Sequence, residues 1–181
     1  MNARSLLLPL LCAALSVQAA DFALQSPDLV EGGKLSLRQV YDASGCHGGN
    51  RSPALAWHGA PAATRSFAVT VYDPDAPTGR GWWHWTVFDL PPSTHGLPAG
   101  AGNPGGELPT GARQGRSDFG SSGYGGACPP AGDKPHRYQF TVWALDVPSL
   151  GLGAASGGAM VGYALRTHVL GQARITVTYG R

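Results

Sequence analysis

Charged side chains are scarce in this chain, where they make up 13% of the 181 residues, about half of the usual share. The formal net charge is only +2, and the basic residues form no cluster that could follow a phosphate backbone. Nucleic-acid binding is therefore not expected. Long amphipathic helices need more Glu and Lys than the chain provides, whereas 27 Gly and 15 Pro residues favour a β-protein with many turns.

Long hydrophobic runs are also missing. The apolar stretch LLLPLLCAAL at 6–15 is shorter than the roughly 18 residues that a membrane-spanning helix requires. A basic residue precedes this stretch and small residues follow it, which is the pattern of a secretory signal peptide. We expect cleavage after Ala19 or Ala20, so that residues 1–20 are removed. Residues 21–181 then form a single domain without a transmembrane anchor.

Cysteine is rare once the signal peptide is set aside, because only Cys46 and Cys128 remain. An even number of cysteines in an exported protein suggests a disulfide. Two free buried thiols are the alternative, and a metal-binding pair is less favoured because neither residue belongs to a C-x-x-C motif. We predict a disulfide between Cys46 and Cys128.

Alternation of apolar and polar side chains predicts the strands. The clearest segments are 66–73, 84–90, 136–145 and 173–180, and weaker ones are 21–25, 34–37 and 54–57. One helix is predicted over 157–171, where apolar side chains recur at helical spacing and Gly171 provides a stop signal. The loop 91–114 is long enough to suggest a functional role.

A polar site is predicted where three of these strands begin or end. The segment VYDPDAPTGRGWWHWTVF at 71–88 reads as a hairpin, so Asp73 at the end of one strand lies near His84 at the start of the next. His136 also begins a strand and reaches the same rim if that strand runs in the matching direction. Tyr138 shares a face with His136 because side chains alternate along a strand.

The surroundings of this site are expected to suit an anion. Trp82, Trp83 and the loop GYGGACPP at 123–130 would wall it, and the glycines would add bare backbone N–H groups to the imidazole and phenol donors. Asp75 either shapes the turn or lines the pocket, whereas Arg137 points away from its neighbours and is left out. For each residue alone, a turn or surface role is the commoner explanation, and only their convergence favours a site. One proline of the loop between Asp73 and Pro77 is expected to be cis.

The motifs DPDAPTGRGWWHW, GYGGACPP and HRYQFTVWALD together resemble the phosphatidylethanolamine-binding protein family, also called the Raf kinase inhibitor-like family, and above all its exported bacterial branch. GCHGGNRSPALAW, LPTGARQGRSDFG and GAMVGYAL extend the likeness over almost the whole mature chain. The resemblance implies a mainly β fold with a large central antiparallel sheet, a smaller second sheet and peripheral helices. It also implies a periplasmic or secreted protein with an anion pocket formed by Asp73, His84, Gly125, Gly126, Pro130, His136 and Tyr138.

The expected function is therefore that of an exported, non-catalytic protein that needs no cofactor or metal and binds a small phosphate- or carboxylate-bearing ligand, in the manner of a kinase-inhibitor-like modulator. Trp83 and Cys128 replace a histidine and a glycine of the eukaryotic pattern, so eukaryotic partners, kinases included, do not carry over. The main alternative is a hydrolase that acts on a phosphate or ester with the His/Asp pocket, although no G-x-S-x-G motif is present. A zinc or iron site on the same residues, and a contact with an unidentified protein partner through 91–114, are further alternatives.

Overall fold

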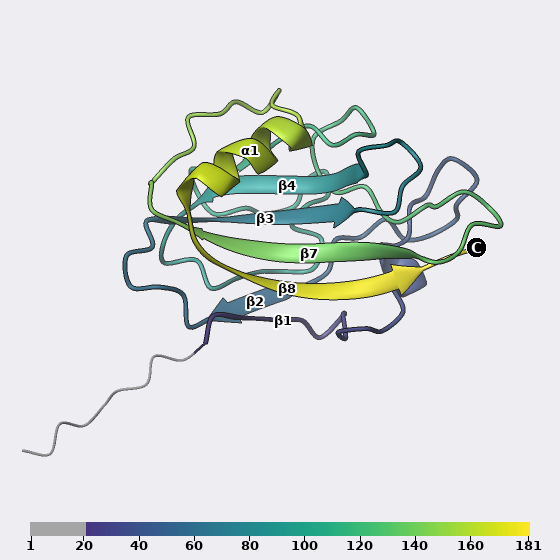
Figure 1. The fold of residues 1–181 in the computed structure, drawn as a ribbon, viewed down its shortest axis with the longest axis horizontal. Helices are drawn as coiled ribbons and strands as arrows, with labels where there is room; N and C mark the ends of the chain where they lie inside the picture. The colour runs from purple at the N-terminus through teal and green to yellow at the C-terminus, as the bar shows by residue number, and fades with distance from the viewer. Residues whose placement is uncertain (1–20) are drawn as a thin grey trace, which may run out of the picture.

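The computed structural model describes residues 21–181, so the signal peptide expected at 1–20 lies outside the described residues. Within the described part, eight strands form two antiparallel sheets, with the smaller sheet packed behind the larger one (Figure 1). The five-stranded sheet has the order β6 (Arg113–Gln114), β4 (Trp82–Leu90), β3 (Ser66–Asp73), β7 (His136–Leu145) and β8 (Val169–Tyr179). The three-stranded sheet has the order β1 (Ala23–Gln25), β2 (Leu55–His58) and β5 (Gly96–Leu97). This mainly β architecture confirms the fold class predicted from the sequence.

The main hydrophobic core lies between the two sheets. Alternate residues of β3, among them Phe67, Val69 and Val71, face it and are buried. Trp57 of the smaller sheet packs against Phe67 with ring centroids 5.5 Å apart. Burial of each large apolar side chain contributes about 1.5–3 kcal/mol, so these contacts hold the sheets together.

The other face of the large sheet carries a smaller apolar cluster beneath helix α1 (Gly158–His168). Val161 and Leu165 of α1 are buried against residues of β3, β4 and β7. The helix ends at His168 and β8 begins at once, so the helix stop predicted at Gly171 was wrong. Gly171 is instead paired with Ala144 of β7, because the long ladder with β7 outweighs the local helical pattern.

Two other local expectations were wrong. The weak strand expected at 34–37 is reduced to an isolated bridge between Lys34 and Thr178 of β8. A short 3-10 helix, η1 (Leu37–Gln39), follows, and Ser36 caps it by accepting the Arg38 N–H. Within residues 21–181 no peptide bond is cis, and the turn after β3 is closed by the carboxylate of Asp73 instead of a cis proline. In the same range, no helix has the length and the apolar character that crossing a bilayer demands.

Candidate functional site

Three strand ends meet at one rim of the large sheet. Asp73 of β3 pairs with Trp82 of β4, and the neighbouring residue Tyr72 pairs with Gln139 of β7. The end of β3 therefore lies beside the starts of β4 and β7, as the sequence predicted. A cavity of about 450 Å³ opens at this rim. Its lining comprises Ser44, Asp73, Ala76, Pro77, Thr78, Trp82, His84, Asp118, Phe119, Cys128, Pro129, Pro130, His136 and Tyr138.

A β-bulge turns His84 into the cavity. Tyr72 pairs with Trp83 and Val71 pairs with Trp85, so His84 is the extra residue of β4. Bulges re-aim side chains in this way and are frequent beside functional sites. Trp82 and His84 line the cavity, but Trp83 lies on the opposite face of the sheet, where its ring centroid is 4.7 Å from that of Tyr72. The prediction that Trp83 forms a wall of the site was therefore wrong, because side chains alternate between the faces of a strand.

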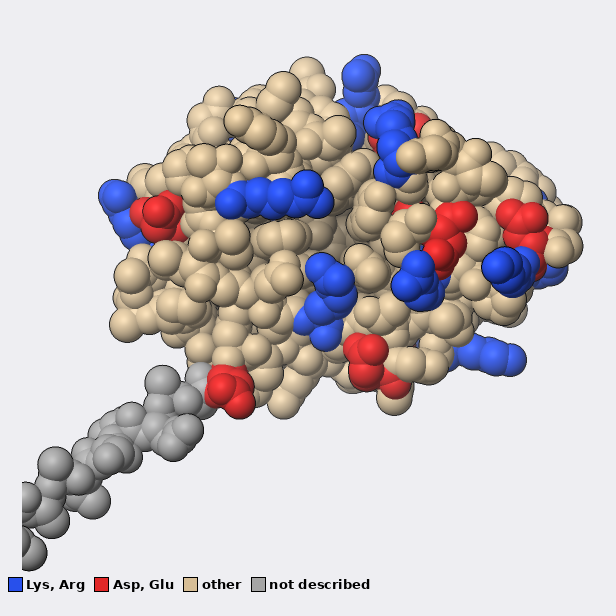
Figure 2. All heavy atoms as spheres, in the orientation of Figure 1, with Lys and Arg blue, Asp and Glu red and all other residues tan. Residues whose placement is uncertain are grey.

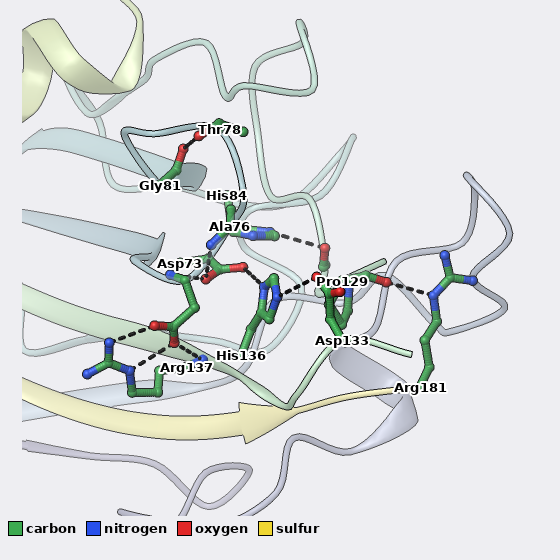
Figure 3. A network of polar contacts seen from close by, with 12 residues as sticks. Asp73, Ala76, Thr78, Gly81, His84, Pro129, Asp133, His136, Arg137 and Arg181 are labelled. Atoms are coloured by element: carbon green, nitrogen blue, oxygen red, sulfur yellow. Dashed lines mark hydrogen bonds and ion pairs between the residues drawn. The ribbon is translucent and has the colours of Figure 1, made fainter. Parts of the chain in front are cut away.

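His136 and Asp73 form a buried pair that links β7 to β3 (Figure 3). His136 Nδ1 lies 2.7 Å from Asp73 Oδ2, and the other carboxylate oxygen accepts the N–H groups of Asp75 and Ala76 at 2.8 and 3.1 Å. Asp73 accepts the hydrogen bond, so Nδ1 of His136 carries a proton. The second ring nitrogen, Nε2, is 3.4 Å from Asp133 Oδ2, and the Asp133 side chain is 43% exposed. A carboxylate that is not part of the cavity lining therefore lies against the second nitrogen of this imidazole and competes with any ligand for it.

His84 is held by two backbone carbonyl groups. Its Nδ1 lies 2.8 Å from the oxygen of Gly125 and 3.1 Å from that of Gly126. A carbonyl oxygen only accepts, so Nδ1 is the protonated nitrogen and donates. Burial lowers the pKa of His84, since the charged imidazolium loses its hydration there. The neutral ring therefore offers Nε2 as an acceptor, and it donates from this atom only after protonation.

Gly125 and Gly126 were expected to offer their backbone N–H groups to a ligand, and the structure shows another role for them. Gly125 N–H donates to the carbonyl of His84, and Gly126 N–H donates to Asn50 Oδ1, so neither group is available to a ligand. A Cβ atom at Gly125 would collide with the ring of Phe119, and one at Gly126 would collide with backbone atoms. Glycine is needed here because the chain passes so close to its neighbours. The glycines position His84, and the prediction that they lend backbone donors to the pocket was wrong.

Two buried donors in the lining have no partner. The indole Nε1–H of Trp82 and the hydroxyl of Tyr138 are inaccessible, and neither has a hydrogen-bond partner within residues 21–181. Burial raises the pKa of Tyr138, so its hydroxyl keeps its proton. Phe119 packs edge-on against Trp82 and His84, with both centroid distances at 5.4 Å. The cavity thus combines an aromatic wall with unsatisfied donors, and each donor costs about 1–3 kcal/mol until an acceptor reaches it.

The opposite wall is formed by Cys128, Pro129 and Pro130. Cys128 is joined to Cys46 with their Cα atoms 5.9 Å apart, which confirms the predicted disulfide. Arg181 adds a second tie, because its guanidinium donates to the carbonyl of Pro129 at 2.7 Å (Figure 3) and to that of Gly45 at the same distance. The loops that carry this wall are therefore fixed both covalently and by hydrogen bonds.

Asp75 and Arg137 lie outside the cavity. Arg137 donates to the Asp75 carboxylate through Nη2 at 2.7 Å and through Nε at 2.8 Å. This contact lowers the pKa of Asp75 to about 2. Neither role considered for the Asp75 side chain is observed: the carboxylate binds Arg137 at the start of β7, and only the backbone N–H of Asp75 takes part in the turn by donating to Asp73. Arg137 points away from the cavity as predicted.

Several residues at the cavity were not predicted from the sequence, among them Asp118 and Phe119 of the lining, and neither was Asp133 beside His136. Asp118 Oδ2 accepts the backbone N–H of Trp83 at 2.9 Å and so attaches its loop to the start of β4. The motif LPTGARQGRSDFG contains Asp118 and Phe119, but it lies in an irregular segment where no periodicity shows its direction. In residues 21–181, no three His, Cys, Asp or Glu side chains are grouped in a way that could hold a metal ion.

Known proteins resemble this chain in both sequence and fold. The model of the family described as "Phosphatidylethanolamine-binding protein" matches residues 25–180. The chain belongs to this family. The UPF0098 protein YbcL of Escherichia coli K12 is 54% identical over 165 residues, which cover 91% of this chain and 90% of YbcL. YbhB of the same organism is 50% identical over 156 residues, 86% of this chain and 98% of YbhB.

Solved structures of phosphatidylethanolamine-binding proteins share the fold. The crystal structure of E. coli YbcL, described as a new member of the mammalian PEBP family, has a TM-score of 0.87 and 53% identity, covering 90% of this chain and 99% of that one. The Chlamydia trachomatis homologue CT736 has a TM-score of 0.73 and 29% identity, covering 88% and 97%. The two-sheet architecture is therefore that of the family.

Proposed function

We propose that the protein binds a small phosphate- or carboxylate-bearing ligand in the cavity at the rim of the large sheet, without turning it over. The observation that carries this proposal is the pair of buried donors, Trp82 Nε1–H and Tyr138 O–H, that have no partner within residues 21–181. Both atoms are shielded from solvent, so the side chains around them must shift before oxygen atoms of a ligand satisfy the two groups and remove the cost of burying them unpaired.

The charges in the cavity narrow the form of the ligand. Asp73 and Asp118 line it, and the lining contains no Lys or Arg within the described part of the chain. A fully ionised dianion would be repelled by these carboxylates, and it would meet the bare Nε2 of neutral His84. A phosphate group that still carries one acidic proton, or a carboxylic acid, fits better, because its O–H donates to Nε2 while its other oxygens accept from Trp82 and Tyr138.

We also propose that the protein acts outside the cytoplasm. The Cys46–Cys128 disulfide supports this, because such bonds persist in oxidising compartments and are rare in the cytosol. The signal peptide expected at 1–20 is consistent with export.

Isothermal titration with phosphoethanolamine and with phosphotyrosine tests the binding site. His84→Ala should abolish the binding seen with the wild-type protein, because it removes the only ring nitrogen that accepts in the proposed arrangement. His47→Ala is the matched control, since His47 is exposed and does not line the cavity. Binding that is unchanged in His84→Ala would overturn the assignment of the ligand to this cavity.

A hydrolase is the second candidate, and the His136–Asp73 pair favours it, because a histidine oriented by a buried carboxylate is a common general base. Against it, the free nitrogen of His136 faces Asp133 and no nucleophilic side chain. Release of p-nitrophenol from p-nitrophenyl phosphate or p-nitrophenyl acetate should match the uncatalysed rate. Release that depends on His136 would contradict the non-catalytic proposal.

A further inference from the structure

A second hollow lies on the outer face of the large sheet, opposite the cavity. Alternation along the strands separates the two, because Asp73 and Trp82 face the cavity whereas Tyr72 and Trp83 face outwards. The hollow, hereafter the outer groove, measures about 320 Å³, and helix α1 closes one side of it. Figure 2 shows the molecule from this side, with basic side chains set in uncharged surface near the middle and acidic side chains towards the edges.

The floor of the outer groove contains a row of hydroxyl groups that hold larger side chains. Thr70 of β3 pairs with Thr141 of β7, which pairs with Arg174 of β8. Thr141 Oγ1 accepts from Arg174 Nε, and Thr70 Oγ1 accepts from the Trp143 indole, both at 3.0 Å. These bonds fix a guanidinium and an indole on the sheet. The terminal nitrogens of Arg174 have no partner within residues 21–181, so a preorganised pair of donors remains for an oxyanion.

All charged side chains that line the outer groove are basic. Arg80, Arg166 and Arg174 line it, and no Asp or Glu of the described chain does. Arg80 is 3.9 Å from its nearest acidic partner, Asp118, which is a weak pair, and neither of the other two arginines forms an ion pair within residues 21–181. Unpaired arginines of this kind attract carboxylate, sulfate or phosphate groups.

Aromatic rings form the rest of the surface. Tyr72, Trp83 and Trp143 are half-buried in the outer groove, and Tyr163 of α1 stands at its edge with 74% of its surface exposed. An inorganic anion would use the arginines and leave these rings uncovered, whereas an uncharged ring would leave the arginines unpaired. A ligand that carries both a ring and an anionic group would contact the aromatic side chains and the arginines of the outer groove together.

We infer that the outer groove is a second binding site, for a small ligand that carries an oxyanion on a ring. A sugar acid and an aromatic acid share this chemistry, and the volume of about 320 Å³ suits a single ring of either kind. The ring covers the aromatic side chains, and the oxyanion pairs with Arg174 and its neighbours. This site is independent of the ligand proposed for the cavity, since it lies on the other face of the sheet.

The test uses the indole N–H signals of the purified protein in two-dimensional NMR, assigned with single Trp→Phe variants. Four probes are titrated: galacturonate and 4-hydroxybenzoate join a ring to a carboxylate, galactose has a ring without charge, and acetate has the charge without a ring. Shifts of the Trp143 and Trp83 signals report the outer groove, and shifts of the Trp82 signal report the cavity. A carboxylate that binds only in the cavity would shift the Trp82 signal and leave those of Trp143 and Trp83 unchanged.

We expect at least one of the two ring acids to shift the Trp143 and Trp83 signals at concentrations where galactose and acetate do not. Galacturonate alone would identify a sugar acid, and 4-hydroxybenzoate alone an aromatic acid. Arg174→Gln should weaken this binding about 10-fold or more, since it removes a charged bidentate donor. Arg65→Gln, an exposed arginine outside the outer groove, should leave it unchanged. The inference is overturned if neither acid shifts these signals, if acetate binds as well as the ring acids, or if Arg65→Gln has the effect of Arg174→Gln.

Discussion

His136 Nδ1 and Asp73 Oδ2 lie 2.7 Å apart, and their side chains are only 5% and 4% exposed. The same carboxylate accepts two backbone N–H groups of the turn that follows β3. The buried carboxylate of Asp73 therefore holds both the turn after β3 and the imidazole of His136, which belongs to β7 and lines the cavity. Residues that shape the candidate site also stabilise the fold, so binding and stability have to be measured together in every variant.

His136→Ala should lower the free energy of unfolding by about 3 kcal/mol, because it leaves the Asp73 carboxylate buried with one partner fewer. Urea denaturation at pH 7 measures this change. His47→Ala removes an exposed imidazole and should stay within about 0.5 kcal/mol of the wild type. Equal effects of the two substitutions would show that the His136–Asp73 contact contributes little to stability.

Stability should fall as the pH drops below about 6.5, owing to His84. Burial lowers the pKa of His84 in the folded protein below its ordinary value of 6.5, so between these two values the unfolded chain binds a proton that the folded chain does not. Stability from this group is therefore present above pH 6.5 and is lost progressively below it. Urea denaturation between pH 5 and 8 should show a steeper slope for the wild type than for His84→Gln. Identical slopes would contradict the burial of a neutral His84.

The rim of the candidate site could be predicted from the sequence because alternation and antiparallel pairing are local rules. They placed Asp73, His84, His136 and Tyr138 together, and the same rule applied to β4 would have excluded Trp83. Other parts depend on contacts between distant segments. The end of α1 is set by the ladder with β7, and the 123–130 loop, whose carbonyl groups bind His84, is held in part by Asn50, which lies 76 positions before Gly126. Periodicity carries no information on either.

Asp75 should titrate with a pKa of about 2, because the Arg137 guanidinium donates two hydrogen bonds to its carboxylate and the Arg137 backbone N–H donates a third. In Arg137→Gln the value should rise towards the ordinary 3.8, as carboxyl 13C NMR would show. Since the folded-state pKa is the lower one, the pair stabilises the fold above pH 3.8 and loses this effect as the pH falls towards 2. Solvent screens the pair, because the Arg137 side chain is 55% exposed, so its contribution to the free energy of unfolding should be small. An Asp75 midpoint that Arg137→Gln does not move would refute the contact.

The disulfide should stabilise the fold and the far wall of the cavity. It closes a separation of 82 residues, and loss of such a link costs about 2–5 kcal/mol. Non-reducing mass spectrometry should find Cys46 linked to Cys128, and the variant with serine at both positions should unfold at lower urea concentration. Addition of a reductant should bring the wild type to the midpoint of that variant. A midpoint that neither change alters would show that the loops are held by Arg181 and packing alone.

Trp82 and Trp83 are adjacent in the chain, but substitution by Phe should affect ligand binding at Trp82 and stability at Trp83. Trp82→Phe keeps a ring in the cavity but removes an unpaired buried donor, so phosphoethanolamine binding should weaken about 5- to 10-fold with little change in stability. Trp83→Phe should leave that binding unchanged and lower the free energy of unfolding by about 1–2 kcal/mol, because Gly158 and Gly162 of α1 pack directly on the indole. Titration calorimetry and urea denaturation of both variants provide the two readouts. If Trp83→Phe weakens binding as much as Trp82→Phe, the ligand does not lie on the cavity side of the sheet.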